Sequence, residues 1–341
     1  MRIGIVGLNA RHWPGAFARC AGQTGGVELR AAADLGRSAD ELRTTLGTDA
    51  PTFAERFGLR IYRDPAEMIA QERLEAVFVC SEHTAQADLI EIVCRSGAHV
   101  YVAKPMATTL ADADRIVRAV QEAGTIATTG MTERFDGALR EAHRLLRSGA
   151  IGEPLMVRAL HQHGSIKTFG PDDWYWRPEQ GGPELSLIWY VADVLRWFVD
   201  APVARVYAEY ENFASPGSPF MDNGKAIFRF VNRVIGSFDV YFAVEGFRFP
   251  SWEIEVVGTR GALRTQQSSY EGMLFAAEGP KSFYRSQSDL LLAEVQAWLA
   301  CCREGKRPDV TVEHARDVLE IALACRRSST RHEPVELPLR D

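Results

Sequence analysis

Short apolar runs and longer helical patterns alternate along the first third of the chain. The runs contain few polar positions, which is typical of strands that are buried on both faces of a parallel sheet. They cover residues 2–8, 27–34, 76–80, 99–102 and 125–128. Because helical patterns lie between these runs, the order of elements indicates repeated strand–helix–strand units.

The helical patterns place apolar residues three and four positions apart and have capping residues at their ends. They cover residues 38–46, 64–71, 84–96 and 108–123. Asp64 followed by Pro65 is a typical helix start, and Gly97 stands where a helix commonly ends. Crossovers of this kind are right-handed and put helices on both faces of the sheet. We therefore predict an α/β fold in which residues 1–125 form a doubly wound, Rossmann-type dinucleotide-binding domain.

The pattern changes after residue 125. Helices are predicted over residues 135–148, 185–199, 289–304 and 312–328. Strands are predicted over residues 155–162, 204–213, 225–231, 234–244, 252–257 and 262–265, with a loop over 165–180. Closely spaced strands joined by turn-like pairs such as Asn232-Arg233 favour antiparallel pairing. Residues 126–341 are therefore predicted to form an α+β domain with a mostly antiparallel sheet.

Composition and charge narrow the classes of protein that need to be considered. The chain has 341 residues, 46% hydrophobic and 25% charged, as is usual for globular proteins. Its 39 basic and 45 acidic residues leave a net charge of −6, which gives no electrostatic reason to expect nucleic acid or an anionic membrane as partner. Six scattered cysteines, no apolar stretch of about 20 residues and no signal-like start lead us to expect a cytoplasmic protein.

The first apolar run ends at Gly7, and a helix is expected from about residue 13. A strand–turn–helix unit directs backbone N–H groups and the positive end of a helix towards a pyrophosphate. The usual G-x-G-x-x-G spacing would put glycines at positions 7, 9 and 12, but the chain has Asn9 and His12. Because Asn tolerates a positive φ, Gly7, Asn9, Ala10 and His12 are predicted to contact a dinucleotide. The alternative is an ordinary turn without a ligand.

Asp34 closes the second apolar run, where a carboxylate can accept hydrogen bonds from the adenosine ribose. A carboxylate at this place repels a 2′-phosphate, which favours NAD over NADP as the cofactor. Arg37 lies three residues later and could bind such a phosphate, so NADP stays open. The alternative for Asp34 is a turn residue that caps the next segment.

Four segments together resemble the Gfo/Idh/MocA oxidoreductase family, which includes glucose–fructose oxidoreductase and inositol dehydrogenase. They are VYVAKPMATT (100–109), SGAIGEP (148–154), WRPEQGGPELSLIWYVADVLRW (176–197) and VELP (335–338). The resemblance covers almost the whole chain. It implies a Rossmann domain, a second domain with an open-faced sheet, and an active site between them. It also implies tightly bound NAD or NADP and a sugar, inositol or related polyol as substrate.

The resemblance implies roles for residues around the third and fourth apolar runs. The family's Glu-Lys-Pro motif is Ala103-Lys104-Pro105 here, without the carboxylate. In the family, the lysine helps to bind cofactor and substrate and assists proton transfer at the reacting hydroxyl. Ser81 and His83 follow the third run and are expected to contact the cofactor together with Lys104 and Pro105.

The catalytic motif of the family has changed in this chain. Family members have an Asp, a His four residues later and a second Asp three residues after that. Counting back from Asp193 puts Tyr190 at the His position and Ser186 at the first Asp position. A tyrosine has a pKa near ~10, and a neighbouring ammonium such as that of Lys104 would lower it. We therefore expect Tyr190 as acid/base with Lys104 as its electrostatic partner; the alternative is that Tyr190 is a core aromatic.

Six residues are expected on the substrate side of the site: Arg134, His163, Trp174, Arg177, Ser186 and Asp193. Aromatic faces with nearby charges can bind a sugar, whereas the alternative for the cluster around Trp174 is a loop pinned to the core. The alternative for Asp193 is an ion pair. His161 and His163 have the spacing of a zinc pair, but no further His or Cys lies close by, so no metal is expected.

The leading hypothesis is an NAD(P)-dependent oxidoreductase that transfers a hydride between nicotinamide and a hydroxyl or ketone of a sugar-like or polyol substrate. Two alternatives stay open. One is a redox-neutral enzyme that uses NAD for elimination, epimerisation or glycoside cleavage, and the other is a non-catalytic binding or regulatory protein. An open sheet face and the resemblance both suggest a homodimer or homotetramer.

Overall fold

The computed structural model describes residues 1–162, 173–214, 218–243, 251–266, 271–276, 278–284 and 289–340. The chain packs as two compact units. Unit 1 contains Met1–Met131, Asp173–Gln180 and Leu291–Asp317, and unit 2 contains Thr132–Asp172, Gly181–Leu290 and Val318–Asp341. The units are thus not two consecutive stretches, as a single boundary between residues 125 and 126 would make them, because later segments pack into unit 1.

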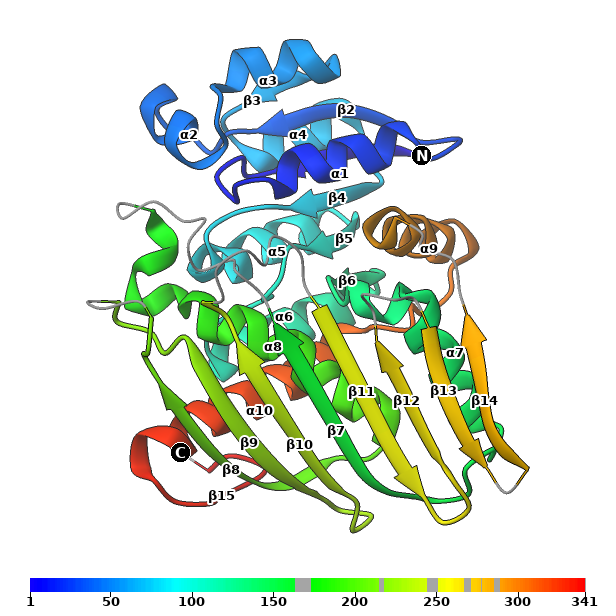
Figure 1. The fold of residues 1–341 in the computed structure, drawn as a ribbon. Coiled ribbons are helices and arrows are strands. Elements are labelled where there is room, and N and C mark those ends of the chain that lie inside the picture. Colours follow the sequence, from blue (N-terminus) through cyan, green and yellow to red (C-terminus); the bar gives the residue numbers. More distant parts are fainter. Residues whose placement is uncertain are drawn as a thin grey trace. The chain divides into compact units, whose positions relative to one another are not determined.

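The sheet of unit 1 has the strand order β3-β2-β1-β4-β5-β6, with parallel pairing throughout (Figure 1). The strands are β1 (Arg2–Val6), β2 (Glu28–Ala33), β3 (Arg60–Tyr62), β4 (Ala76–Val79), β5 (His99–Val102) and β6 (Ala127–Thr129). This order confirms the predicted doubly wound sheet. It reverses between β1 and β4, so the crevice at their carboxyl ends is where such folds bind ligands.

The helices of unit 1 begin largely where the capping residues predict. They are α1 (Trp13–Gly22), α2 (Ala39–Thr45), α3 (Ala50–Phe57), α4 (Pro65–Glu72), α5 (Gln86–Arg95), α6 (Leu110–Ala123) and α9 (Leu290–Glu304). Ser38 forms a capping box with Glu41, and Asp64 caps α4. The pattern did not predict α3 or β3, because an eight-residue helix and a three-residue strand carry too few apolar positions to reveal a period.

An aromatic cluster in unit 1 joins residues from distant parts of the chain. The rings of Phe17 and Phe78 stack with centroids 4.7 Å apart. Trp298 lies 5.4 Å from Phe78 and 5.5 Å from Tyr101, and all four side chains are buried. Helix α9 therefore completes the core of the amino-terminal sheet, although it is encoded about 200 residues after β5.

Unit 2 is built on a sheet with the order β14-β13-β12-β11-β7-β10-β9-β8-β15 (Figure 1). Its strands are β7 (Pro154–Gln162), β8 (Val203–Glu211), β9 (Asn223–Phe230), β10 (Ile235–Tyr241), β11 (Ser251–Gly258), β12 (Ala262–Gln266), β13 (Glu271–Ala276), β14 (Gly279–Tyr284) and β15 (Val335–Glu336). Among these described strands, β7 and β10 pair in parallel and the other neighbours pair antiparallel. The predicted mostly antiparallel sheet is confirmed, although β13, β14 and β15 were not predicted.

One face of this sheet is covered by helices and the other is open. Helix α8 (Gly182–Val199) packs on β7 and β10, and α7 (Gly137–Arg147) packs on β12 and β13. Helix α10 (Val312–Arg331) begins in unit 1 and continues in unit 2 from Val318. The open face carries exposed apolar side chains, which are Met156, Tyr207, Ile227, Val257 and Phe275. In the part of the chain that the structure describes, no helix is both long and apolar enough to cross a bilayer.

We predict that Trp298→Ala destabilises unit 1 by about 3–5 kcal/mol, because it opens a large cavity in a fully packed aromatic cluster. Hydrogen exchange of the β4 and β5 amides should accelerate by the corresponding factor, while exchange in β8 and β9 stays close to that of the unmodified protein. Phe213→Ala is the control, since this side chain is 74% exposed and its removal should change the unfolding free energy by less than about 0.5 kcal/mol. Equal effects of the two substitutions would contradict the packing of α9 into unit 1.

Candidate functional site

The turn after β1 is shaped by a close backbone approach at Gly7. Gly7 has φ +85°, and a Cβ at this position would lie 2.5 Å from the carbonyl oxygen of Cys80. Its N–H donates to the Ala33 carbonyl at 2.9 Å, so the residue also touches the end of β2. Only glycine fits both the conformation and the space. The glycine expected from the sequence therefore holds the ends of β1, β2 and β4 together.

Asn9 lies inside this turn and has an unsatisfied acceptor. Its side-chain amide donates to Glu82 Oε1 at 3.3 Å. Asn9 Oδ1 is buried and accepts no hydrogen bond from any described residue. A buried oxygen of this kind costs free energy unless a hydroxyl or a water supplies the donor. The turn thus fits a ligand that brings hydroxyl groups, as a dinucleotide does; Ala10, also predicted to contact it, is buried beside Asn9.

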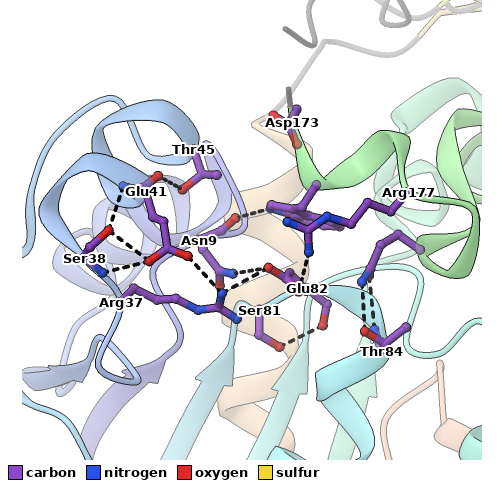
Figure 2. A network of polar contacts seen from close by, with 12 residues as sticks. Asn9, Arg37, Ser38, Glu41, Thr45, Ser81, Glu82, Thr84, Asp173 and Arg177 are labelled. Atoms are coloured by element: carbon purple, nitrogen blue, oxygen red, sulfur yellow. Dashed lines mark hydrogen bonds and ion pairs between the residues drawn. The ribbon is translucent and has the colours of Figure 1, made fainter. Parts of the chain in front are cut away.

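Asp34 and Arg37 stand at the carboxyl end of β2, as predicted. Asp34 is partly buried, and its Oδ1 accepts a hydrogen bond from the Gly36 N–H at 2.8 Å. Arg37 Nη1 lies 3.4 Å from Glu41 Oε1 and 3.3 Å from Glu82 Oε1. The guanidinium therefore links the loop after β2 to the loop after β4 (Figure 2).

The Asp173–Gln180 segment lies across the same edge of unit 1. Arg11 Nη1 and Asp173 Oδ2 form an ion pair at 2.8 Å. The indole N–H of Trp174 donates to the Asn9 carbonyl at 2.7 Å, and Arg177 Nη1 lies 3.8 Å from Glu82 Oε2. Trp174, predicted to bind substrate, thus contacts the turn that is predicted to bind the coenzyme. Arg177, also predicted to bind substrate, approaches the loop after β4 instead (Figure 2).

Gln180 fastens the end of this segment to the loop after β4. Its side chain donates to Thr84 Oγ1 at 2.8 Å and accepts from the Thr84 N–H at 3.2 Å. The backbone carbonyl oxygen of Gln180 lies 2.6 Å from His83 Nδ1. Because a carbonyl oxygen can only accept, Nδ1 of the neutral imidazole carries the proton. The Trp174 ring packs edge-on against His83 with centroids 5.0 Å apart.

Two histidines near Lys104 are held neutral. Burial lowers the pKa of His83 to about 4, with the charge of Lys104 in the same direction and the hydrogen bond to Gln180 opposing both. Burial, then Lys104, then Arg11 lower the pKa of His12 to about 4. The His12 side chain keeps an exposed edge, but the two cations favour the same direction as burial. Both imidazoles are therefore uncharged at neutral pH.

Lys104 stands directly after β5, with its side chain partly buried. The Gln86 side-chain amide donates to the Ala103 carbonyl at 2.9 Å and fixes the backbone just before the lysine. Pro105 is buried, and the Ser81 hydroxyl donates to the Glu82 carbonyl at 3.1 Å. The residues predicted to contact the coenzyme therefore gather at the carboxyl ends of β1, β2, β4 and β5, at the topological switch point.

Two of the residues predicted to lie on the substrate side, Arg134 and Asp193, bind each other in unit 2. Arg134 and Asp193 form a buried two-pronged ion pair, with distances of 2.8 Å from Nε and 2.6 Å from Nη2. The Arg134 guanidinium also lies 5.5 Å from the centre of the Trp197 ring. This is the ion pair that was the alternative for Asp193, and it joins η2 (Thr132–Phe135) to α8.

Tyr190 differs from its neighbours on α8. Ser186 is buried, as are Leu187, Ile188 and Trp189, whereas Tyr190 keeps part of its surface exposed. The ring of His161 stands perpendicular to that of Tyr190 with centroids 6.3 Å apart. Tyr190 is therefore not a fully enclosed core aromatic.

One of the two histidines with the spacing of a zinc pair is enclosed by aromatic side chains. His161 is fully buried and stacks on Trp252, with ring centroids 4.0 Å apart. His163, predicted to contact substrate, lies outside the described residues. Within the described ranges, no group of three or more His, Cys, Asp or Glu side chains could hold a metal ion.

Sequence reasoning missed Glu82, Thr84 and Gln180. Glu82 and Thr84 flank His83, so their place after a buried strand was a usable signal. The partners Arg11 and Asp173 are separated by 162 residues, and no local pattern relates them.

Comparisons with known proteins agree with this geometry. Residues 1–131 match the family model described as "Oxidoreductase family, NAD-binding Rossmann fold", and residues 139–264 match the GFO/IDH/MocA C-terminal domain. Myo-inositol 2-dehydrogenase of Thermotoga maritima is 25% identical over 297 residues, which are 83% of this chain and 86% of that protein. D-apiose dehydrogenase of Paraburkholderia graminis is 27% identical over 301 residues, or 83% of this chain and 78% of that protein.

A solved structure shows the same fold over nearly the whole chain. Levoglucosan dehydrogenase in complex with NADH and levoglucosan superposes with a TM-score of 0.86 at 17% identity, covering 99% of each chain. The two matched domain models, the doubly wound parallel sheet and the coenzyme-type turn point to one conclusion: the chain belongs to the GFO/IDH/MocA family of oxidoreductases, whose amino-terminal domain is an NAD-binding Rossmann fold.

Proposed function

We propose that the protein is an NAD-dependent dehydrogenase or reductase that acts on a hydroxyl or ketone of a sugar-like or polyol substrate. The observation that carries the proposal is Lys104, which follows β5 at the carboxyl edge of a sheet of the NAD-binding type, beside two neutral histidines. Relatives named for myo-inositol and D-apiose, and a structural neighbour named for levoglucosan, support a polyhydroxylated substrate.

The turn and the loop after β2 would hold the coenzyme. Gly7 leaves room for a close approach, Asn9 offers its buried Oδ1 to a donor, and Asp34 offers a carboxylate to ribose hydroxyls. NAD, when bound, supplies the acceptor for a hydride from the substrate carbon. His12 and His83 are neutral and add no positive charge beside Lys104. The positive charge that they could have contributed therefore does not compete with the Lys104 ammonium.

Lys104 and Tyr190 would carry the proton chemistry. An alcohol that loses a hydride must also lose its hydroxyl proton, and a positioned base accelerates this step. Tyr190 takes the place of the family's histidine on α8 and, unlike the three residues before it, is partly exposed. In this proposal Tyr190 exchanges the proton, and the Lys104 ammonium stabilises the negative charge that develops on the substrate oxygen.

A redox-neutral reaction is the second candidate. It is favoured by Ser186 and Tyr190, which stand where the family has an Asp and a His. Such an enzyme would convert its substrate without net accumulation of NADH, whereas a dehydrogenase accumulates one NADH for each substrate oxidised. Absorbance of NADH during incubation with inositols, aldoses and anhydrosugars separates the two.

We predict that Tyr190→Phe lowers kcat for polyol oxidation by about 10²- to 10⁴-fold, because the proton acceptor is removed. NAD binding should stay within about twofold of that of the unmodified protein, since the coenzyme contacts we propose all come from unit 1. Lys104→Met should lower kcat to a similar extent. Tyr207→Phe is the matched control on the open sheet face and should keep full activity. Undiminished turnover by Tyr190→Phe refutes the assignment of the proton acceptor.

The open sheet face of unit 2 would bind a second copy of the chain. Strand pairing places Phe275, Ala262, Val257, Met156 and Ile235 in one row across five strands. Phe275 is 43%, Val257 39% and Met156 53% exposed, and a row of this kind is usually covered by a partner. Two ion pairs lie beside this row, between Lys225 and Asp239 at 2.7 Å and between Arg264 and Glu255 at 2.6 Å. A surface that carries both positive and negative side chains suits a self-complementary interface.

We predict that Met156→Glu shifts the protein from a dimer or tetramer to a smaller species, because it puts a charge into the apolar row. Sedimentation velocity measures this directly. Phe213→Glu, which adds a charge at an exposed position away from the row, should leave the oligomer intact. A protein that sediments as a monomer before any substitution would contradict this part of the proposal.

A further inference from the structure

Arg37 is placed where a cation decides between two coenzymes. It follows Asp34 by three residues in the loop after β2. NADP differs from NAD by a 2′-phosphate on the adenosine ribose, and Arg side chains near the end of this strand accommodate that phosphate. A guanidinium binds a phosphate through strong charge-assisted hydrogen bonds, and carboxylates that already lie against it compete with that phosphate for its charge and donors.

Two carboxylates approach the Arg37 guanidinium at one nitrogen. Its Nη1 lies 3.3 Å from Glu82 Oε1 and 3.4 Å from Glu41 Oε1. The Glu82 side chain is 12% exposed and the Arg37 side chain 29%, so solvent screens their attraction only in part. Glu41 is 52% exposed, and its hold on Arg37 is accordingly weaker.

Glu41 is held in position by the start of α2. Its carboxylate accepts from the Ser38 N–H at 2.9 Å and from the Ser38 hydroxyl at 3.0 Å. The backbone hydrogen bond from Ser38, then its side-chain hydrogen bond, then Arg37 hold the pKa of Glu41 below its usual range. Glu41 therefore stays ionised at neutral pH and keeps its charge beside Arg37 (Figure 2).

Glu82 is anchored from several directions. Its Oε1 accepts from the Asn9 side chain at 3.3 Å as well as facing Arg37, and its Oε2 lies 3.8 Å from Arg177. These contacts fix the carboxylate between the coenzyme-type turn and the loop after β2. A second negative group brought to this place would meet the carboxylates of Glu41 and Glu82 at one guanidinium.

We propose that Glu41 and Glu82 are specificity-determining residues: by occupying Arg37 they withhold it from a 2′-phosphate and make the protein select NAD over NADP. This inference rests on the proposed use of a nicotinamide dinucleotide at the Gly7 turn. Asp34 acts on the ribose directly, whereas Glu41 and Glu82 act through Arg37. Removing either carboxylate leaves Asp34 in place and releases a cation for the phosphate.

The test compares the dissociation constants of NADH and NADPH, followed by the fluorescence of the bound nucleotide, in the purified full-length chain. The variants are Glu82→Gln, Glu41→Gln, the double variant, and each of these with Arg37→Ala. Glu82→Gln removes the charge without changing the packing, since glutamine keeps the size of the side chain and the acceptor for Asn9. Glu41→Gln likewise keeps the capping box, which glutamine at the third helix position still completes. Glu55→Gln, an exposed carboxylate on α3, is the control for overall charge.

We expect Glu82→Gln to improve NADPH binding relative to NADH by about tenfold, and Glu41→Gln by about threefold because its charge is more screened. Arg37→Ala alone should change the ratio little, yet it should abolish the gain in both glutamine variants. The gain from Glu41→Gln should also shrink at high salt. Melting temperatures measured without nucleotide confirm that each variant is folded.

Three results would overturn the inference. One is an unmodified protein that binds NADPH as tightly as NADH. Another is a ratio that moves less than about twofold in both glutamine variants, and a third is an equal shift in Glu55→Gln. Failure of polyol oxidation is a separate outcome: a protein that prefers NADH through Arg37 but oxidises no polyol refutes the proposed reaction and leaves the selection intact.

Discussion

The candidate site depends on the contact between Gly7 and the carbonyl of Cys80. A side chain at Gly7 would meet that carbonyl at 2.5 Å, so the two strand ends come together only because there is no Cβ. This approach brings Asn9 from the β1 turn within hydrogen-bond distance of Glu82 after β4. Arg37 then reaches Glu82 from the loop after β2. The polar network is thus a consequence of one backbone contact at the point where the strand order reverses.

The arginine side chains around the Gly7 turn are balanced by carboxylates. Arg11 faces Asp173, and Arg37 and Arg177 both approach Glu82, so each guanidinium of the turn region has a carboxylate nearby. Burial and Lys104 keep His12 and His83 uncharged. Lys104 is therefore the cation of this edge for which sequence and resemblance imply chemistry.

The sequence predicted well what depends on local chain properties. Period and caps located β1, β2, β4, β5 and most helices, because buried parallel strands and capped helices leave strong local patterns. Gly7, Asp34 and Lys104, which the sequence predicted to follow strand ends, lie at one edge of the sheet in the structure. The open-faced, mostly antiparallel sheet was also predicted, but the hairpin of β13 and β14 was not, since its short strands lack a strict alternation.

What the sequence could not predict are the contacts between distant segments. Nothing local in Asp173–Gln180 marks it as a partner of the Gly7 turn, and Trp298 looks like any apolar position on an amphipathic helix. That late position has a consequence for how the protein is made. During translation the whole parallel sheet leaves the ribosome long before Trp298 is synthesised, so the nascent unit carries an uncovered aromatic surface around Phe78 and Tyr101. Folding of unit 1 is therefore completed only once residues 291–317 have emerged, and until then this aromatic surface can associate with other chains.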